Sequence, residues 1–430
     1  VRRINFSGNL KTDDSVLRRE MRQFEGAQAS AEKIDLSKVR LQRLGFFSDV
    51  KIDNARVPGT TDQVDLNVAV TEQPSGSISA SLGYSQNAGL VFGANVSQSN
   101  FLGTGNRVSI GLNRSDVRDA YNVSFLNPYF TPEGISRGYN FYLRQTKLDD
   151  LNISNYSTDS MGANISFSYP IDETETISFS AGIDQTEISL GVNPSEAVFN
   201  FTKDNGNSLM TYTTSAAWSR NTLNRGTFPT AGASQSVALE LGLPGSDVSF
   251  YKLTYNAQRY FPVRHDWVGR GYARLGYGDA LSGDSLPFYR NFFGGGFGSV
   301  RGFRDNSMGP RSQRLSLSNP AVLLPESESI GGNVQVEGGV ELIFPVPFIE
   351  DKSKIRTLAF FDVGNIFDTN SNSTSTTDFK PSISNLRYSV GVGLSWITPI
   401  GPLTFAVAKP LNTKEGDDTQ AFQFSLGQGF

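Results

Sequence analysis

The chain has 430 residues, of which 38% are apolar and 11% aromatic, and it carries a formal net charge of −4. This balance disfavours a general nucleic-acid binder, and the absence of cysteine excludes a disulfide framework or a cysteine-ligated metal. The low apolar content, together with 43 glycines, favours many short strands joined by polar turns over a thick two-sided core.

Residues 1–75 are predicted to form a small α/β domain with the element order β-α-α-β-β. The first strand precedes a helix that Thr12 caps. The apolar positions on one face of that helix are Leu17, Met21 and Phe24. Ser30 caps a second helix, and two alternating strands end the domain. The domain is too small for a typical enzyme, but short strands leave sheet edges that a partner can extend, so we predict a binding module.

Apolar and small polar residues alternate with a period of two throughout residues 76–430. Runs such as Ile177-Ser178-Phe179 are typical, with one apolar and one polar face. The segment contains about sixteen such runs of roughly ten residues, which is the pattern of an antiparallel transmembrane β-barrel with a polar lumen. A soluble sandwich or propeller also alternates, but no fixed blade period is visible. The predicted fold class is therefore mainly β, a barrel of about 16 strands after one α/β domain.

The first and last strands of this barrel are predicted to meet at a lateral seam, because a strand that runs to the final residue closes the barrel against its start. The last strand is rich in residues that offer no apolar side chain to pack, and glycine weakens a strand interior. The candidate seam residues are Ser77, Ser79, Ser81 and Gly83 in 76–84, and Ser425, Gly427, Gly429 and Phe430 in 421–430.

One long segment, at about 280–332, interrupts the alternation, and no convincing strand is predicted there before Asn333. Glycines crowd its centre at 294–310. A connection of this length is usually functional, and a glycine-rich backbone can approach other backbone closely. Arg301, in the middle of the glycines, carries five donors and stays charged, so inside a barrel it needs carboxylates nearby.

Two carboxylates on neighbouring predicted strands are candidate partners for that cation. Alternation places Glu341 and Asp362 on the lumen face, where either could form a charge-assisted bond with Arg301. The alternative is that both acids only solvate the lumen. Arg270 and Arg274 share the lumen face of another strand, and we expect them to pair with lumen acids rather than to steer anionic segments.

Three stretches together resemble the BamA family of outer-membrane protein assembly factors. Residues 300–303 resemble its VRGF motif, 360–364 resemble its F-x-D-x-G strand motif, and 1–73 resemble the POTRA domain that directly precedes its barrel. The combination covers essentially the whole chain and is specific. The resemblance implies a latch, a turn folded into the lumen, made of Val300, Arg301, Gly302 and Phe303 with Glu341 and Asp362 as partners.

The resemblance implies that the protein inserts and folds β-barrel proteins into the bacterial outer membrane by edge-strand pairing at the seam, with POTRA in the periplasm. The implied partners are unfolded outer-membrane β-barrel proteins, periplasmic-side lipoproteins of the BAM complex and outer-membrane lipid. Glu25 matches an acidic position that contacts a lipoprotein in relatives. We also expect the chain to be the carboxy-terminal piece of a longer precursor with further POTRA domains.

Two other classes of function compete with assembly. A two-partner-secretion-type pore that exports a polypeptide would share POTRA, barrel and latch. An outer-membrane enzyme would need a catalytic cluster, but the single histidine, His265, lies at a predicted turn beside Asp266. No phosphate-binding glycine motif occurs, and the acid pairs 149–150 and 417–418 have no further metal-ligating residues directly beside them in the sequence. We therefore expect no enzyme, no catalytic or metal site and no cofactor.

Overall fold

The structure is a computed structural model, and it describes residues 1–86, 88–147, 155–264, 266–282, 285–316, 319–346, 354–370, 380–398, 401–414 and 416–426. The chain divides into two compact units, Val1–Ser79 with Asn95–Gly111 and Asn122–Asn140, and Ala80–Ala94 with Leu112–Tyr121 and Phe141–Phe430. Within these ranges no helix is both long and apolar enough to cross a membrane.

The amino-terminal domain has the predicted order β-α-α-β-β. Its elements are β1 (Ile4–Ser7), α1 (Asp14–Arg18), α2 (Ala31–Arg43), β2 (Phe47–Arg56) and β3 (Val64–Glu72). The central strand β3 pairs in parallel with β1 and antiparallel with β2, and it buries Leu66 and Val68 in the domain core. Ser30 Oγ accepts a hydrogen bond from Lys33 N, which confirms the predicted cap of α2.

The first helix differs from its prediction. It begins after Asp13 and ends at Arg18, so the spacing that placed Phe24 on the buried face does not persist, and Phe24 is 61% exposed. Thr12 does not cap the helix with its side chain. Its backbone N–H instead donates to Glu72 Oε1 on β3 at 2.7 Å, and Lys11 N donates to the same carboxylate at 3.1 Å.

Glu72 therefore fastens the turn before α1 to the sheet, and we expect Glu72→Gln to destabilise this domain by about 1–2 kcal/mol. Burial raises the pKa of Glu72, but hydrogen bonds from Thr12 and Lys11 outweigh it and hold the pKa below its usual value. The stabilisation is thus present above the unfolded-state pKa of about 4.3 and lost as the pH falls through the lower folded pKa. Amide exchange at Lys11 and Thr12 from pH 7 to pH 3 measures it, with the exposed Glu32→Gln as control. Equal protection in both variants would contradict this assignment.

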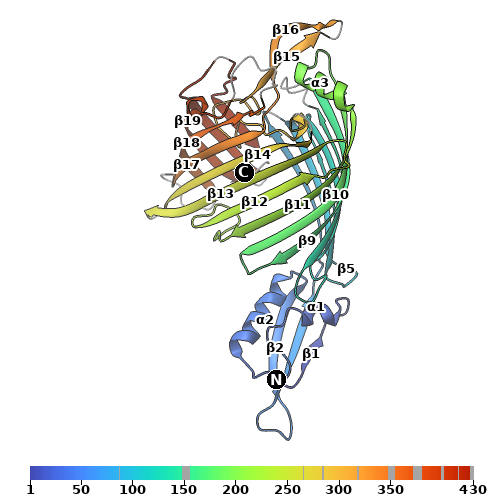
Figure 1. Ribbon diagram of the computed structural model, residues 1–430. Helices are drawn as coiled ribbons and strands as arrows, with labels where there is room; N and C mark the ends of the chain where they lie inside the picture. The colour runs from blue at the N-terminus through green and yellow to red at the C-terminus, as the bar shows by residue number, and fades with distance from the viewer. Residues whose placement is uncertain are drawn as a thin grey trace. The chain divides into compact units, whose positions relative to one another are not determined.

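Sixteen strands close into a barrel in which β21 pairs with β4, which confirms the predicted architecture over the described residues (Figure 1). The strands are β4 (Gly76–Ser85), β5 (Gly89–Phe101), β6 (Asn106–Arg114), β7 (Arg118–Asn127), β8 (Ser136–Lys147), β9 (Tyr156–Pro170), β10 (Glu175–Leu190), β11 (Ser208–Asn221), β12 (Gly232–Gly242), β13 (Ser249–Arg264), β14 (Trp267–Ser282), β17 (Val334–Phe344), β18 (Ile355–Phe367), β19 (Arg387–Thr398), β20 (Gly401–Pro410) and β21 (Phe422–Leu426).

The two faces of the barrel wall follow the alternation of the sequence. On β17, Val340 and Leu342 are exposed on the outside, while Glu341 between them is buried. On β18, Phe361 is exposed and the adjacent Asp362 is buried. Successive side chains of a strand point to opposite faces, so a period of two gives an apolar outer surface and a polar interior.

The segment between β14 and β17 contains regular structure that was not predicted. It holds a short 3₁₀ helix, Phe288–Arg290, and a hairpin of β15 (Arg311–Ser316) and β16 (Asn319–Ser329). The prediction of no strand before Asn333 was wrong because β15 is mostly polar and the apolar residues of β16, at 321–324, are consecutive and do not alternate with polar ones. A further helix, α3 (Glu196–Asn205), lies against β15 (Figure 1). A second 3₁₀ helix spans Ile383–Asn385.

Candidate functional site: a charged latch in the barrel lumen

The latch turn, residues 300–303, is fastened to the barrel wall by a two-pronged ion pair. Arg301 Nε lies 2.7 Å from Asp362 Oδ2, and Arg301 Nη2 lies 2.7 Å from Asp362 Oδ1. The backbone N–H of Arg301 also donates to Asp362 Oδ2, at 3.2 Å. Arg301 is 6% exposed and Asp362 is 0% exposed. The planar guanidinium matches a carboxylate in this geometry, so the pair fixes direction as well as charge.

A second carboxylate and a second arginine extend this pair into a network across three adjacent strands. Arg301 Nη2 is 2.9 Å from Glu341 Oε1 on β17, and Arg270 Nη1 of β14 is 2.9 Å from Glu341 Oε2. Tyr272 of β14 donates its hydroxyl to Asp362 Oδ1 at 2.9 Å. Two cations face two anions, so the cluster is neutral, and each buried charge has an opposite partner.

Apolar packing holds the turn on its other sides. The Arg301 guanidinium lies over the ring of Phe360, 3.5 Å from its centroid, which is a cation–π arrangement in a desolvated place. Val300 and Phe303 are buried together with Met308 in a small cluster of the loop. Since the arginine points to the wall and its neighbours pack within the loop, the turn has one docked orientation.

Glycine is required at two positions here. Gly302 has φ +93°, in the left-handed region, and a Cβ on it would lie 3.1 Å from Cβ of Ala408 on β20. A Cβ on Gly339 of β17 would lie 2.8 Å from Asp362 Oδ1. The first glycine lets the chain turn away after Arg301, and the second leaves room for the carboxylate that receives it.

The charged network continues along the loop to a second acid of β17. Arg274 on β14 lies 3.9 Å from Glu337 Oε2 and donates to the carbonyl of Gly298. Ser299 donates its hydroxyl to Glu337 Oε1 and accepts from the N–H of Gly295 at 2.8 Å. The expectation that Arg270 and Arg274 pair with lumen acids therefore agrees with these contacts.

Sequence reasoning missed Tyr272, Ser299 and Glu337 as members of this network. Tyr272 could have been found, because it lies between two arginines of the same strand face and alternation points it inward. Glu337 faces the lumen by the same rule. Ser299 lies in an irregular loop, where no period predicts the direction of a side chain.

The described part of the seam joins the end of β4 to β21. In the described residues β21 pairs with β4 through Ser425 with Ser85 and Leu426 with Tyr84. Of the predicted seam residues, Ser77, Ser79 and Ser81 are exposed on β4 and Gly83 is buried. Gly427, Gly429 and Phe430 lie outside the described residues.

Glu25 is engaged within its own domain. Its Oε1 accepts from Ile4 N at 2.8 Å and lies 3.2 Å from Arg18 Nη1. The hydrogen bond from Ile4 and the nearby Arg18 hold the pKa of Glu25 below its usual value. His265 and the acid pair 149–150 lie outside the described residues.

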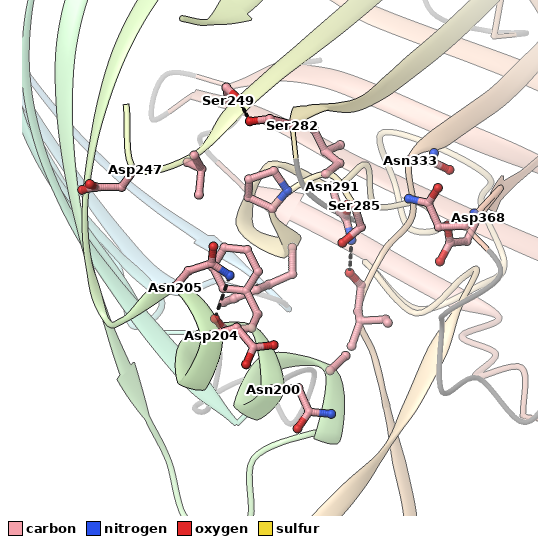
Figure 2. A pocket seen from close by; sticks show the side chains of 18 residues that line it. Asn200, Asp204, Asn205, Asp247, Ser249, Ser282, Ser285, Asn291, Asn333 and Asp368 are labelled. Carbon is pink, nitrogen blue, oxygen red and sulfur yellow. Dashed lines mark hydrogen bonds between the residues drawn. The ribbon is translucent and has the colours of Figure 1, made fainter. Parts of the chain in front are cut away.

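A cavity of about 350 Å³ lies beside α3 and the loop after β14 (Figure 2). Its carboxylates, Asp204, Asp247 and Asp368, lie on different sides of the cavity in Figure 2, so they form no common charged cluster. Asn291 Nδ2 donates to Ile330 O at 2.9 Å, a bond within the protein. No latch residue lines this cavity, so the latch and not the cavity is the candidate site.

Comparison with known proteins places the chain in a family. The Omp85 superfamily domain matches residues 100–430, and the POTRA domain, described as a surface antigen variable number repeat, matches residues 1–73. The chain is 34% identical to the outer membrane protein assembly factor BamA of Neisseria meningitidis serogroup B, over 100% of this chain and 56% of that protein. It is 26% identical to the human sorting and assembly machinery component 50 homolog, over 100% and 90%.

Solved structures agree in fold. BamA from Haemophilus ducreyi lacking POTRA domains 1–3 superposes with a TM-score of 0.87 at 33% identity, over 99% of this chain and 83% of that chain. CdiB from Acinetobacter baumannii gives a TM-score of 0.62 at 14% identity, over 99% and 73%, a likeness of fold alone. The chain spans about half the length of its bacterial BamA relatives. The chain belongs to the Omp85 superfamily and is an outer-membrane β-barrel protein with a periplasmic POTRA domain.

Proposed function

We propose that this protein inserts and folds other β-barrel proteins in the bacterial outer membrane by strand pairing at the seam between β4 and β21. The observation that carries the proposal is that the barrel closes by pairing its first strand, β4, with its last strand, β21. The pairs that the described residues form at this seam are Ser425 with Ser85 and Leu426 with Tyr84.

Opening of this seam has a consequence in lipid. Every backbone polar group in the hydrocarbon region must find a partner within protein, so an opened β4 would be an edge that accepts another strand. The terminal strand of an incoming barrel protein can satisfy that edge by β-augmentation. The energy then comes from the folding of the substrate itself, and no catalytic residue, metal or cofactor takes part in the proposed process.

The similarity of the chain to proteins named assembly factors supports the same function. The proposed partners are unfolded outer-membrane β-barrel proteins, outer-membrane lipid and periplasmic-side lipoproteins of an assembly complex. Glu25, on the POTRA domain, is the proposed lipoprotein contact, since its side chain stays partly exposed beside Arg18. The proposed role of the latch is to hold the docked loop, and so the shape of the barrel.

Locking the seam should therefore stop assembly. The chain has no cysteine, so Ser85→Cys with Ser425→Cys adds one pair at register partners that are both buried. The experiment uses cells whose only copy of this protein is the full-length form with the cysteine pair. Oxidation is expected to stop their growth and to lower the levels of other barrel proteins, and reductant is expected to restore both.

The matched control is a disulfide between two strands far from the seam. Ser180 of β10 and Ser215 of β11 are register partners whose hydroxyls lie 2.7 Å apart. Oxidation of this pair as cysteines should leave growth unchanged. If a fully oxidised seam still allows other barrels to assemble, seam opening is not the mechanism, and a pore that exports a polypeptide becomes the better hypothesis for the function of this protein.

A further inference from the structure

The latch turn is bonded to the chain segment that leads into the last strand. Gln420 N donates to Gly302 O at 2.9 Å, and Arg304 N donates to Asp418 O at 2.9 Å. Phe303 between them forms an antiparallel bridge with Thr419. The turn that carries Arg301 therefore pairs with residues 418–420 as a short extra strand.

One buried side chain of β21 completes this pairing. Gln423 is 2% exposed, and its Nε2 donates to Phe303 O at 2.9 Å. Its Oε1 accepts from Gly302 N at 3.5 Å. A primary amide has both a donor and acceptors, so it can bond to the N–H and C=O of a backbone turn together. Displacing β21 from the docked turn would leave these buried groups without partners.

A second glutamine, Gln420, bonds to the residue that directly follows β4, the first strand of the barrel. Gln420 Nε2 donates to Gln86 Oε1 at 3.0 Å, and Phe424 N of β21 donates to the same oxygen at 3.2 Å. The register of Ser425 with Ser85 places Phe424 opposite residue 86, so a side-chain oxygen of Gln86 takes the place of a ladder carbonyl. Gln86 thus joins β21 and the segment that leads into it to the end of β4 through these two hydrogen bonds, which we call the Gln86 clasp.

We propose that Gln423 and Gln420 are positioning residues that couple the docked latch to the closed seam. With Arg301 docked, the turn holds β21 from the lumen side, and Gln86 joins β21 to the first strand. When the latch undocks, Gln423 loses both partners, and on its β4 side β21 keeps the pairing of the seam and the bond to Gln86. Coupling requires an element with two arrangements that both sites bias, and β21, paired with or released from β4, is that element. The inference rests on the proposed function only in requiring that the seam opens.

The test measures seam opening without any substrate. Ser425→Cys is the probe, because Ser425 is buried and a water-soluble maleimide reaches it only when the strands separate. In purified protein in lipid vesicles, Gln423→Met and Arg301→Ala should each raise the labelling rate roughly tenfold, the size expected from losing one or two buried hydrogen bonds. The double variant should label no faster than the faster single one, because both changes release the same contact.

Two further variants complete the design. Gln86→Met removes the hydrogen bonds of the Gln86 clasp and keeps the contacts of Gln423 with the latch, so it should also raise the labelling rate at position 425. This variant replaces Gln423→Met in the experiment if Gln423→Met does not fold. The control is Gln185→Met, since Gln185 bridges β10 and β11 by donating to Ser208 Oγ at 3.3 Å, and its rate should equal that of the probe alone.

The results separate this inference from the proposed function. Labelling of Gln423→Met at the unmodified rate, or a double variant whose rate is the product of the two single effects, overturns the coupling whatever the growth experiment shows. Non-additive acceleration supports the coupling even if a locked seam proves compatible with assembly of other barrels.

Discussion

Arg301→Ala is expected to leave the barrel strands formed and to undock the loop over residues 285–333. The change leaves Asp362, which is fully buried, without its cation, while Glu341 keeps Arg270 at 2.9 Å. Removing one partner of a buried pair costs about 3–5 kcal/mol, because the remaining charge is uncompensated. The loop should become sensitive to protease in membranes, and amides over 294–310 should exchange faster. If the proposed function is correct, assembly should also slow.

Two matched variants separate the bidentate bond from charge alone. Arg301→Lys keeps the charge but lacks the planar guanidinium, so the protease sensitivity of its loop should lie between those of the wild type and Arg301→Ala. Arg304→Ala removes the nearby ion pair with Asp418, whose side chains are 51% and 42% exposed. Such a pair is worth about 0–1 kcal/mol, so digestion should be close to that of the wild type. An unchanged pattern for Arg301→Ala would show that the ion pair does not hold the loop.

Periodicity predicted which face each strand residue occupies, and this is why the barrel and the lumen position of its acids follow from the sequence. Alternation distinguishes Asp362 from Phe361 without any knowledge of neighbours, because the pleat has a period of two. It does not give register. Arg270 stands directly opposite Glu341 across β14 and β17, but a shift of two residues would keep every side chain on the same face, so alternation does not predict that pairing.

The contacts of irregular segments were the part that sequence alone could not give. Alternation places Gln423 on the inner face of the last strand, but its partners lie in a loop more than a hundred residues earlier in the chain. The choice between Glu341 and Asp362 as the main partner of Arg301 also depends on where the loop backbone runs. Glycines at 302 and 339 fix that path through a left-handed turn and a close approach, and neither effect has a periodic signature.

The two acids of the latch are expected to differ in importance. Asp362 accepts both prongs of Arg301, the backbone N–H of the same residue and the Tyr272 hydroxyl. Asp362→Ala therefore removes most of what holds the turn, with an expected cost to loop docking of about 3–5 kcal/mol. Glu341→Ala should cost roughly 1–3 kcal/mol, the range for groups that lose one hydrogen-bond partner, because Arg301 keeps its fork to Asp362.

Amide exchange and limited proteolysis of the loop in membranes should rank the variants, with Asp362→Ala most open and Glu341→Ala closer to the wild type. Asp362→Asn is the matched variant, since it keeps the shape of the side chain and one acceptor but removes the charge, and it should fall between them. Arg270 in the Glu341→Ala protein retains Gln258 Oε1 at 3.1 Å, which limits the damage on that side. If Glu341→Ala opens the loop as far as Asp362→Ala, the loop is held by the shared network of Arg270, Glu341 and Arg301 rather than by the Arg301–Asp362 fork.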